Sequence, residues 1–130
     1  MKSVAEKLLI KPGTILWASD PDRLDLVGPL PDEVGIVDRP TDAAVAVVFA
    51  DDAATVRRII ADHGDALAEP AVVWVAYQKA NRTDINRDTL WPIFAEHGMR
   101  PIGQVAIDDE WSALRFRPLQ AGEAPFTGGR

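Results

Sequence analysis

The chain has 130 residues, 47% of them apolar, which suits one compact domain with its own core and leaves too little material for two. It contains no cysteine, so disulfides, thiolate metal sites and cysteine nucleophiles are excluded. The formal net charge of −6 arises from acids spread over the whole length, so we expect the surface to repel nucleic acid and anionic lipid.

The first half of the chain alternates short apolar runs with polar, proline-containing segments. Ser3 suits the N-cap of a short helix that Pro12 and Gly13 end. Residues 14–19 are apolar on both faces, as in a strand of a parallel sheet that is covered on both sides. Residues 20–33 predict a long loop with a short helix capped by Asp22, and residues 34–37 predict a short second strand.

The middle of the chain has the pattern of a strand, a helix and a strand. The valine-rich residues 43–50 predict a central third strand, and residues 71–77 predict a fourth. Between them, Asp51 or Asp52 suits the cap of a helix whose apolar stripe recurs at helical spacing as far as Leu67. This order predicts a right-handed crossover between two parallel strands.

The last third predicts another helix and a hairpin. Asp84 suits the helix cap, Pro92 should kink the helix and Gly98 should close it. Residues 102–107 and 111–117 predict two strands that pair antiparallel at one edge of the sheet. We therefore expect a single domain over residues 1–118 and a loose tail over residues 119–130. No apolar run approaches the ~20 residues of a membrane helix, and no signal peptide is evident, so we expect a cytoplasmic protein.

This order of elements resembles a shortened Rossmann-like domain of the S-adenosylmethionine-dependent methyltransferases. Residues 9–16 are similar to the lead-in to the first strand of that superfamily, and residues 70–76 resemble the strand after its central crossover. Residues 77–79, 83–84, 108–112 and 115–116 resemble a small bacterial family of uncharacterised domains. The resemblance implies an α/β fold of three layers with strand order 2-1-3-4-6-5, in which the sixth strand is antiparallel to its neighbours. It implies no established activity.

The loop after the first strand departs from the methyltransferase pattern. Active methyltransferases have a glycine-rich loop there, because a backbone without Cβ atoms can approach the cofactor closely. Here residues 19–25 read SDPDRLD, and no glycine occurs before Gly28. The proline removes a hydrogen-bond donor and the three acids repel anionic ligands, so we predict no cofactor.

Ligands of open α/β sheets gather outside the carboxyl ends of the strands. The candidate ligand-binding residues are therefore the polar residues that follow the strands: Ser19, Asp20, Asp38, Lys79 and Asp84, with Asp51 on the same rim. Asp38 has the position of a ribose-binding acid, although acids at strand ends commonly cap turns. Lys79 suits an anion clamp or a base, with an ordinary surface lysine as the alternative, and Asp84 suits either a helix cap or an acid.

The predicted hairpin carries two further groups of residues. Trp111 and Arg115 fall on one strand face and are candidates for partner binding, the alternative being that Trp111 only covers the sheet edge. Asp108, Asp109 and Glu110 offer oxygen atoms to a cation, but adjacent carboxylates are typical of a solvated turn, and we predict no metal.

Three functional hypotheses follow from this pattern. The leading hypothesis is a non-catalytic or accessory domain that binds a partner protein or a small ligand at the carboxyl rim of the sheet. The second is a small-molecule enzyme, a transferase or lyase, that uses Lys79 with Asp38 or Asp84. The third is a structural homodimer in which the sheet edge or the hairpin pairs across a two-fold axis.

Overall fold

The computed structural model describes residues 3–80 and 82–124. The strands are β1 (Ile15–Ala18), β2 (Gly35–Ile36), β3 (Val45–Ala50), β4 (Val72–Gln78), β5 (Met99–Ala106) and β6 (Trp111–Pro118). The helices are α1 (Val4–Lys7), α2 (Ala53–His63) and α3 (Arg87–Ala95), with 3₁₀ helices η1 (Pro21–Val27), η2 (Pro40–Asp42) and η3 (Gly64–Ala68).

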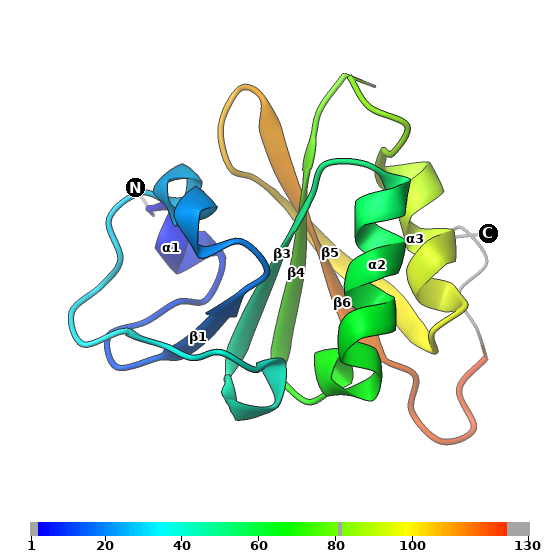
Figure 1. Ribbon diagram of the computed structural model, residues 1–130, viewed down its shortest axis with the longest axis horizontal. Helices are drawn as coiled ribbons and strands as arrows, with labels where there is room; N and C mark the ends of the chain where they lie inside the picture. Colours follow the sequence, from blue (N-terminus) through cyan, green and yellow to red (C-terminus); the bar gives the residue numbers. More distant parts are fainter. Residues whose placement is uncertain (1–2, 81, 125–130) are drawn as a thin grey trace.

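The six strands form one sheet in the order β2-β1-β3-β4-β6-β5, which confirms the predicted order (Figure 1). Neighbouring strands among β1 to β4 are parallel, and β6 runs antiparallel to both β4 and β5. The two valine-rich strands β3 and β4 pair over six residues, from Val45 with Val72 to Ala50 with Tyr77. Every residue of β3 is buried, as expected for a strand covered on both faces.

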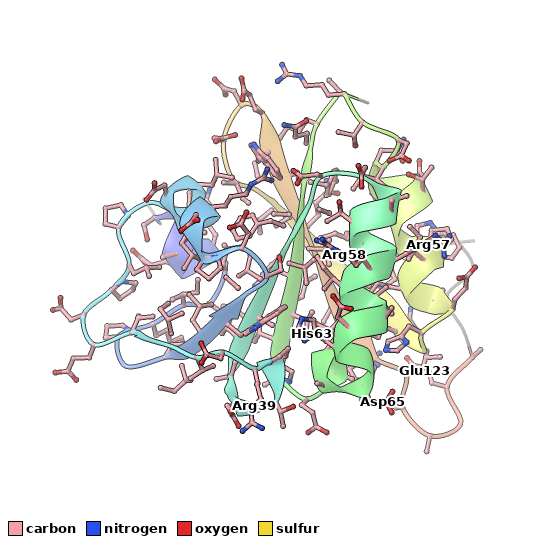
Figure 2. All side chains as sticks on the ribbon, viewed as in Figure 1. Arg39, Arg57, Arg58, His63, Asp65 and Glu123 are labelled. Atoms are coloured by element: carbon pink, nitrogen blue, oxygen red, sulfur yellow. The ribbon has the colours of Figure 1, made fainter. Side chains whose placement is uncertain are left out.

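The helices α2 and α3 cover one face of the sheet (Figure 1). Asp52 caps α2 by accepting a hydrogen bond from the backbone N–H of Thr55, and Val56 and Ile59 turn inward from that helix. Figure 2 shows His63 on the sheet-facing side of α2, where its ring meets Trp17 edge to face at 4.8 Å. His63 is thus a packing residue of this layer.

The opposite face is covered by α1 and η1 together with the loop after η1. Ser3 and Glu6 form a capping box at the start of α1, as the sequence predicts for Ser3. The buried side chains of Ala5, Leu8 and Ile10 pack against this face of the sheet. The two helical layers on either side of the sheet confirm the three-layer architecture.

Three predicted boundaries are wrong for identifiable reasons. The short helix after β1 is a 3₁₀ helix with Pro21 at its start, so Asp22 does not cap it. The helix α2 ends at His63 because Gly64 adopts a φ of +54°, and Leu67 therefore lies on η3. The strand β5 begins at Met99, since Pro101 sits on the sheet edge where no donor is needed.

Part of the predicted tail is fixed to the hairpin. Glu123 accepts hydrogen bonds of 2.8 and 2.7 Å from the two terminal nitrogens of Arg117, and one of 2.8 Å from Arg100. The hydrogen bonds from Arg117, from the backbone N–H of Gln120 and from Arg100 lower the pKa of Glu123 to about 2. Figure 2 shows Glu123 near the open end of the hairpin, where β5 begins and β6 ends. Residues 125–130 of the predicted tail lie outside the described residues.

Within residues 3–80 and 82–124, no helix is long and apolar enough to cross a membrane.

Candidate functional site

The parallel strands β1, β3 and β4 end at one edge of the sheet, which we call the carboxyl edge. Ser19 and Asp20 follow β1, Asp51 follows β3 and Lys79 follows β4. Because β6 is antiparallel, it begins at this same edge, where Trp111 lies opposite Gln78. The carboxyl edge is the place where open α/β sheets bind ligands.

Arg23 crosses this edge and joins three separate segments. Its guanidinium forms an ion pair with Asp51 at the end of β3 and lies 3.5 Å from Asp20. The same group sits over the ring of Trp111, 5.6 Å from the ring centroid. The positive charge is thus paired with two carboxylates and an aromatic face of the protein itself.

Ser19 extends β1 toward β3. Its backbone N–H donates to the carbonyl oxygen of Val47 at 3.0 Å, and its hydroxyl oxygen accepts from the backbone N–H of Phe49 at 2.8 Å. The serine satisfies the strand end in this way, as polar residues at element ends commonly do.

Asp38 lies at the end of β2, at the far side of this edge from Lys79. The side chain is exposed, and no hydrogen bond or ion pair joins it to another residue in the described part of the chain. Since β1 and β3 lie between β2 and β4, Asp38 and Lys79 follow strands that are roughly 14 Å apart at the usual strand spacing. Asp38 and Lys79 therefore follow strands that are not neighbours on this edge.

Lys79 fastens the β5–β6 hairpin to β4. Its ammonium group donates to the carbonyl oxygen of Asp108 at 2.6 Å, and its backbone N–H donates to that of Glu110 at 2.8 Å. Arg82 lies 3.5 Å from the carboxylate of Glu110. The observed contacts of Lys79 are therefore those of a residue that positions the hairpin.

The prediction that Asp84 caps the following helix is wrong. Asn86 is the cap of α3, where its side chain accepts from the backbone N–H groups of Asp88 and Thr89 at 2.8 and 3.0 Å. Asp84 instead accepts from the backbone N–H of Ala53, the first residue of α2, at 2.9 Å. Asp84 contacts the N-terminus of α2 because the loop after β4, which carries Asp84, passes beside that helix end.

Trp111 and Arg115 lie on the same face of β6, as the sequence predicts, but they have different neighbours. Trp111 is 6% exposed and its ring contacts Arg23. Arg115 lies between Trp74 on β4 and Gly103 on β5. The Nε atom of Arg115 is buried and has no hydrogen-bond partner among the described residues.

The acidic turn of the hairpin is organised by its own backbone. A carboxylate oxygen of Asp108 accepts from the N–H groups of Glu110 and Trp111, both at 2.7 Å. This is the usual way in which an aspartate closes a turn. Asp109 and Glu110 project from the turn as exposed side chains.

Arg23 is the residue of this edge that the sequence analysis missed. It is the single cation among the acids of residues 19–25, and that charge pattern was the available signal. Its contact with Asp51 spans 28 positions, which local spacing rules do not reach.

Comparison with solved structures places the fold among Rossmann-fold methyltransferases. The chain is similar to a protein of the NADB-Rossmann superfamily from Streptococcus agalactiae, with a TM-score of 0.59, 11% identity and coverage of 98% of this chain and 71% of that one. It is similar to a B. subtilis m1A22 tRNA methyltransferase, with a TM-score of 0.53, 10% identity and coverage of 93% and 68%. A Streptococcus pneumoniae protein described as a candidate for the same activity was solved with S-adenosyl-L-methionine; its TM-score is 0.57 at 14% identity, with 96% and 73% covered.

No sequence-family model and no curated protein matches the chain. At these identities the likeness establishes a distant, shared fold. The chain therefore has a Rossmann-like methyltransferase fold.

Proposed function

We propose that the chain is a non-catalytic binding domain, in which the carboxyl edge of a methyltransferase-like sheet docks a partner in place of S-adenosylmethionine. The observation that carries this proposal is the position of Arg23. Its ion pairs with Asp20 and Asp51, and its stacking on Trp111, take up polar and aromatic groups at the edge where such folds bind ligands. The resemblance to a small bacterial family of uncharacterised domains is part of the same proposal.

The loop after β1 supports this interpretation. It begins the 3₁₀ helix η1 with Pro21, and no glycine precedes Gly28. In dinucleotide-binding folds, glycines at this position allow the backbone to approach the cofactor closely. Lys79 and Asp84 have separate hydrogen-bond partners and Asp38 follows a different strand from Lys79, which gives no support to a shared catalytic centre.

The charge of the carboxyl edge favours a cationic partner. Asp22, Asp109 and Glu110 are exposed at this edge, and Asp38 is exposed at its far side. The fixed Arg23 is already paired with carboxylates. A partner protein with a basic contact surface would meet complementary charge here, whereas an anionic ligand would be repelled.

Cofactor binding is tested by titrating S-adenosylmethionine and S-adenosylhomocysteine into the protein, with calorimetry and thermal unfolding as readouts. We expect no saturable heat and no stabilisation, whereas a ligand at about 100 times its Kd would add about 2.7 kcal/mol. Saturable micromolar binding that Asp38→Asn weakens would overturn the proposal.

Partner binding is tested by chemical cross-linking and mass spectrometry of material captured on the purified protein. The variant Asp22→Lys/Asp109→Lys reverses two charges on the carboxyl edge, and the control Asp62→Lys reverses one charge on the exposed side of α2. We expect the protein and Asp62→Lys to capture the same basic proteins through cross-links at the carboxyl edge, and the double variant to lose them. Cross-links that map elsewhere, or capture that the double variant retains, would contradict this function.

A further inference from the structure

The two outermost strands of the sheet, which we call its edge strands, differ greatly in length. The edge strand β2 has two residues, whereas β5, at the other edge, has eight. An exposed edge strand displays N–H and C=O groups that can pair with a strand of another chain. The direction of the N–H and C=O groups of β5 therefore decides whether such pairing is possible.

The hairpin fixes the direction of these groups. The N–H of Ile107 donates to the carbonyl oxygen of Trp111 at 3.0 Å, so these residues form a hydrogen-bonded pair. In an antiparallel ladder such pairs alternate with pairs whose amide groups point away from the partner strand. In the register of β5 with β6, the outward positions are therefore Gln104 and Ala106.

Only the first part of β5 carries the features that protect sheet edges. Pro101 removes a donor there, and the ladder is interrupted by a bulge between Pro101 and Gly103. Residues 102–106 contain no charge, and Ile102 is 42% exposed. The second part of the strand thus has neither lysine nor proline to discourage pairing.

The outward-facing part of β5 is also held rigidly. The side-chain amide of Gln104 donates to the hydroxyl of Tyr77 at 2.8 Å and to that of Ser112 at 3.2 Å. These bonds tie the edge strand to β4 and β6 on one face of the sheet. Pairing with another strand would therefore cost little additional ordering.

We propose that β5 pairs antiparallel with β5 of a second copy of this chain, about a two-fold axis beside Val105. In this register Gln104 of each copy lies opposite Ala106 of the other. The outward N–H and C=O groups of these residues then form four hydrogen bonds. Val105 stands opposite its counterpart in a non-hydrogen-bonded pair.

Charge complementarity favours a second copy over an unrelated peptide. The same register places Asp108 of one copy opposite Ile102 of the other, so the acidic turn lies beside the start of the facing strand. Arg87 lines a groove of about 340 Å³ together with Ile102 and Gly103. The acidic turn of each copy therefore approaches Arg87 of the other, and the two-fold axis repeats this contact.

Association is tested by sedimentation equilibrium of the full chain up to about 500 µM, where weak dimers with a millimolar to micromolar Kd are detected. We expect a monomer–dimer equilibrium. Ala106→Pro deletes an outward donor without touching the β5–β6 ladder, and we expect it to raise the Kd about tenfold or more. Circular dichroism verifies that this variant is folded.

A second pair of variants does not depend on proline. Ile102→Glu places a negative charge opposite the acidic turn of the other copy, and Ile36→Glu makes the same change on the opposite edge strand, where Ile36 is 46% exposed. We expect Ile102→Glu to weaken association, because like charges then face each other across the two strands, and Ile36→Glu to leave it unchanged. A monomer at all concentrations, or a dimer that Ile102→Glu leaves unchanged, overturns the proposal.

The register is tested by cross-linking, because the chain has no cysteine of its own. Facing residues of a non-hydrogen-bonded pair have Cβ atoms about 4.5 Å apart, at the upper end of the separation in disulfides. We expect Val105→Cys to form a disulfide-linked dimer on mild oxidation, and Ile36→Cys to remain monomeric. Equal cross-linking of the two variants would overturn the proposed register.

Discussion

The indole Nε1 of Trp74, on the central strand β4, donates a 2.8 Å hydrogen bond to the carbonyl oxygen of Leu8, 66 positions earlier in the chain. Both residues are buried, so water does not compete for this bond. The next residue, Leu9, has a φ of 65°, a conformation that residues with a Cβ atom seldom adopt. The hydrogen bond thus fixes the chain where α1 ends and the path to β1 begins.

Trp74→Phe retains an aromatic ring but removes the hydrogen-bond donor to the carbonyl of Leu8. It should lower the free energy of unfolding by about 1–3 kcal/mol, because this buried acceptor is left without a partner. Urea denaturation measures this change. Trp17→Phe is the matched control, since Trp17 is also buried and packs edge-on against His63. Hydrogen exchange should show faster exchange in α1 for Trp74→Phe alone. Equal stability losses with unchanged exchange in α1 would contradict this role of Trp74.

Arg23→Ala should lower the free energy of unfolding by about 1 kcal/mol. Partly exposed ion pairs and cation–π contacts each contribute up to about 1 kcal/mol. The side chain of Arg23 is 34% exposed. Arg39→Ala provides the comparison, since Arg39 pairs with Asp42 at 3.1 Å but is 76% exposed, and it should cost less than about 0.5 kcal/mol. If urea denaturation gives both variants the same stability, Arg23 does not stabilise the carboxyl edge.

Asn86→Ala should cost about 1 kcal/mol, as expected for the loss of a helix cap. Its effect should be confined to α3, where Asn86 accepts from Asp88 and Thr89. Asp84→Ala should instead speed hydrogen exchange in the first turn of α2, because Asp84 accepts a hydrogen bond from the backbone N–H of Ala53. Residue-resolved hydrogen exchange distinguishes the two variants, and the assignment fails if Asp84→Ala affects α3 and spares α2.

The contact of Glu123 with the hairpin should depend on pH in the acid range. Its pKa falls from an ordinary 4.5 to about 2 in the folded protein, chiefly because Arg117 donates to the carboxylate. A lowered folded-state pKa means that the carboxylate stabilises the fold above pH 4.5, and that this contribution is lost as the pH falls toward 2. The Tm difference between the protein and Glu123→Gln should therefore be constant above about pH 5 and shrink below pH 4. A carboxyl resonance that titrates near 4.5 would refute the contact.

The parallel direction of the two central strands could be predicted from the sequence pattern, whereas the strand order was implied by the resemblance to the methyltransferases. Residues 43–50 and 71–77 are apolar on both faces, and the observed strands β3 and β4 fall within a residue or two of those bounds. The crossover rule then leaves one arrangement for the segment between them. The turn residues around Asp108 similarly predicted the hairpin, which forms as expected.

The helix caps and the carboxyl edge were harder to predict because their signals are not local. Asp84 and Asn86 are both good caps, and only the box formed by Asn86 with Thr89 distinguishes them. The contacts of Arg23 join segments that come together only after the sheet has formed. Residue spacing could place Ser19, Asp20 and Lys79 on one edge, but it could not show which groups they would contact.

The position of β6 between β4 and β5 has a consequence for the order of assembly. Strand β6, the last strand of the described residues, fills an interior place in the sheet, so β5 has no neighbour until β6 has been synthesised. A nascent chain that stops within the hairpin therefore exposes the side of β4 that β6 normally covers, together with the apolar residues beneath it. Protease resistance of nascent chains that are held on the ribosome by a C-terminal linker should consequently appear in one late step, once the whole of β6 has left the exit tunnel.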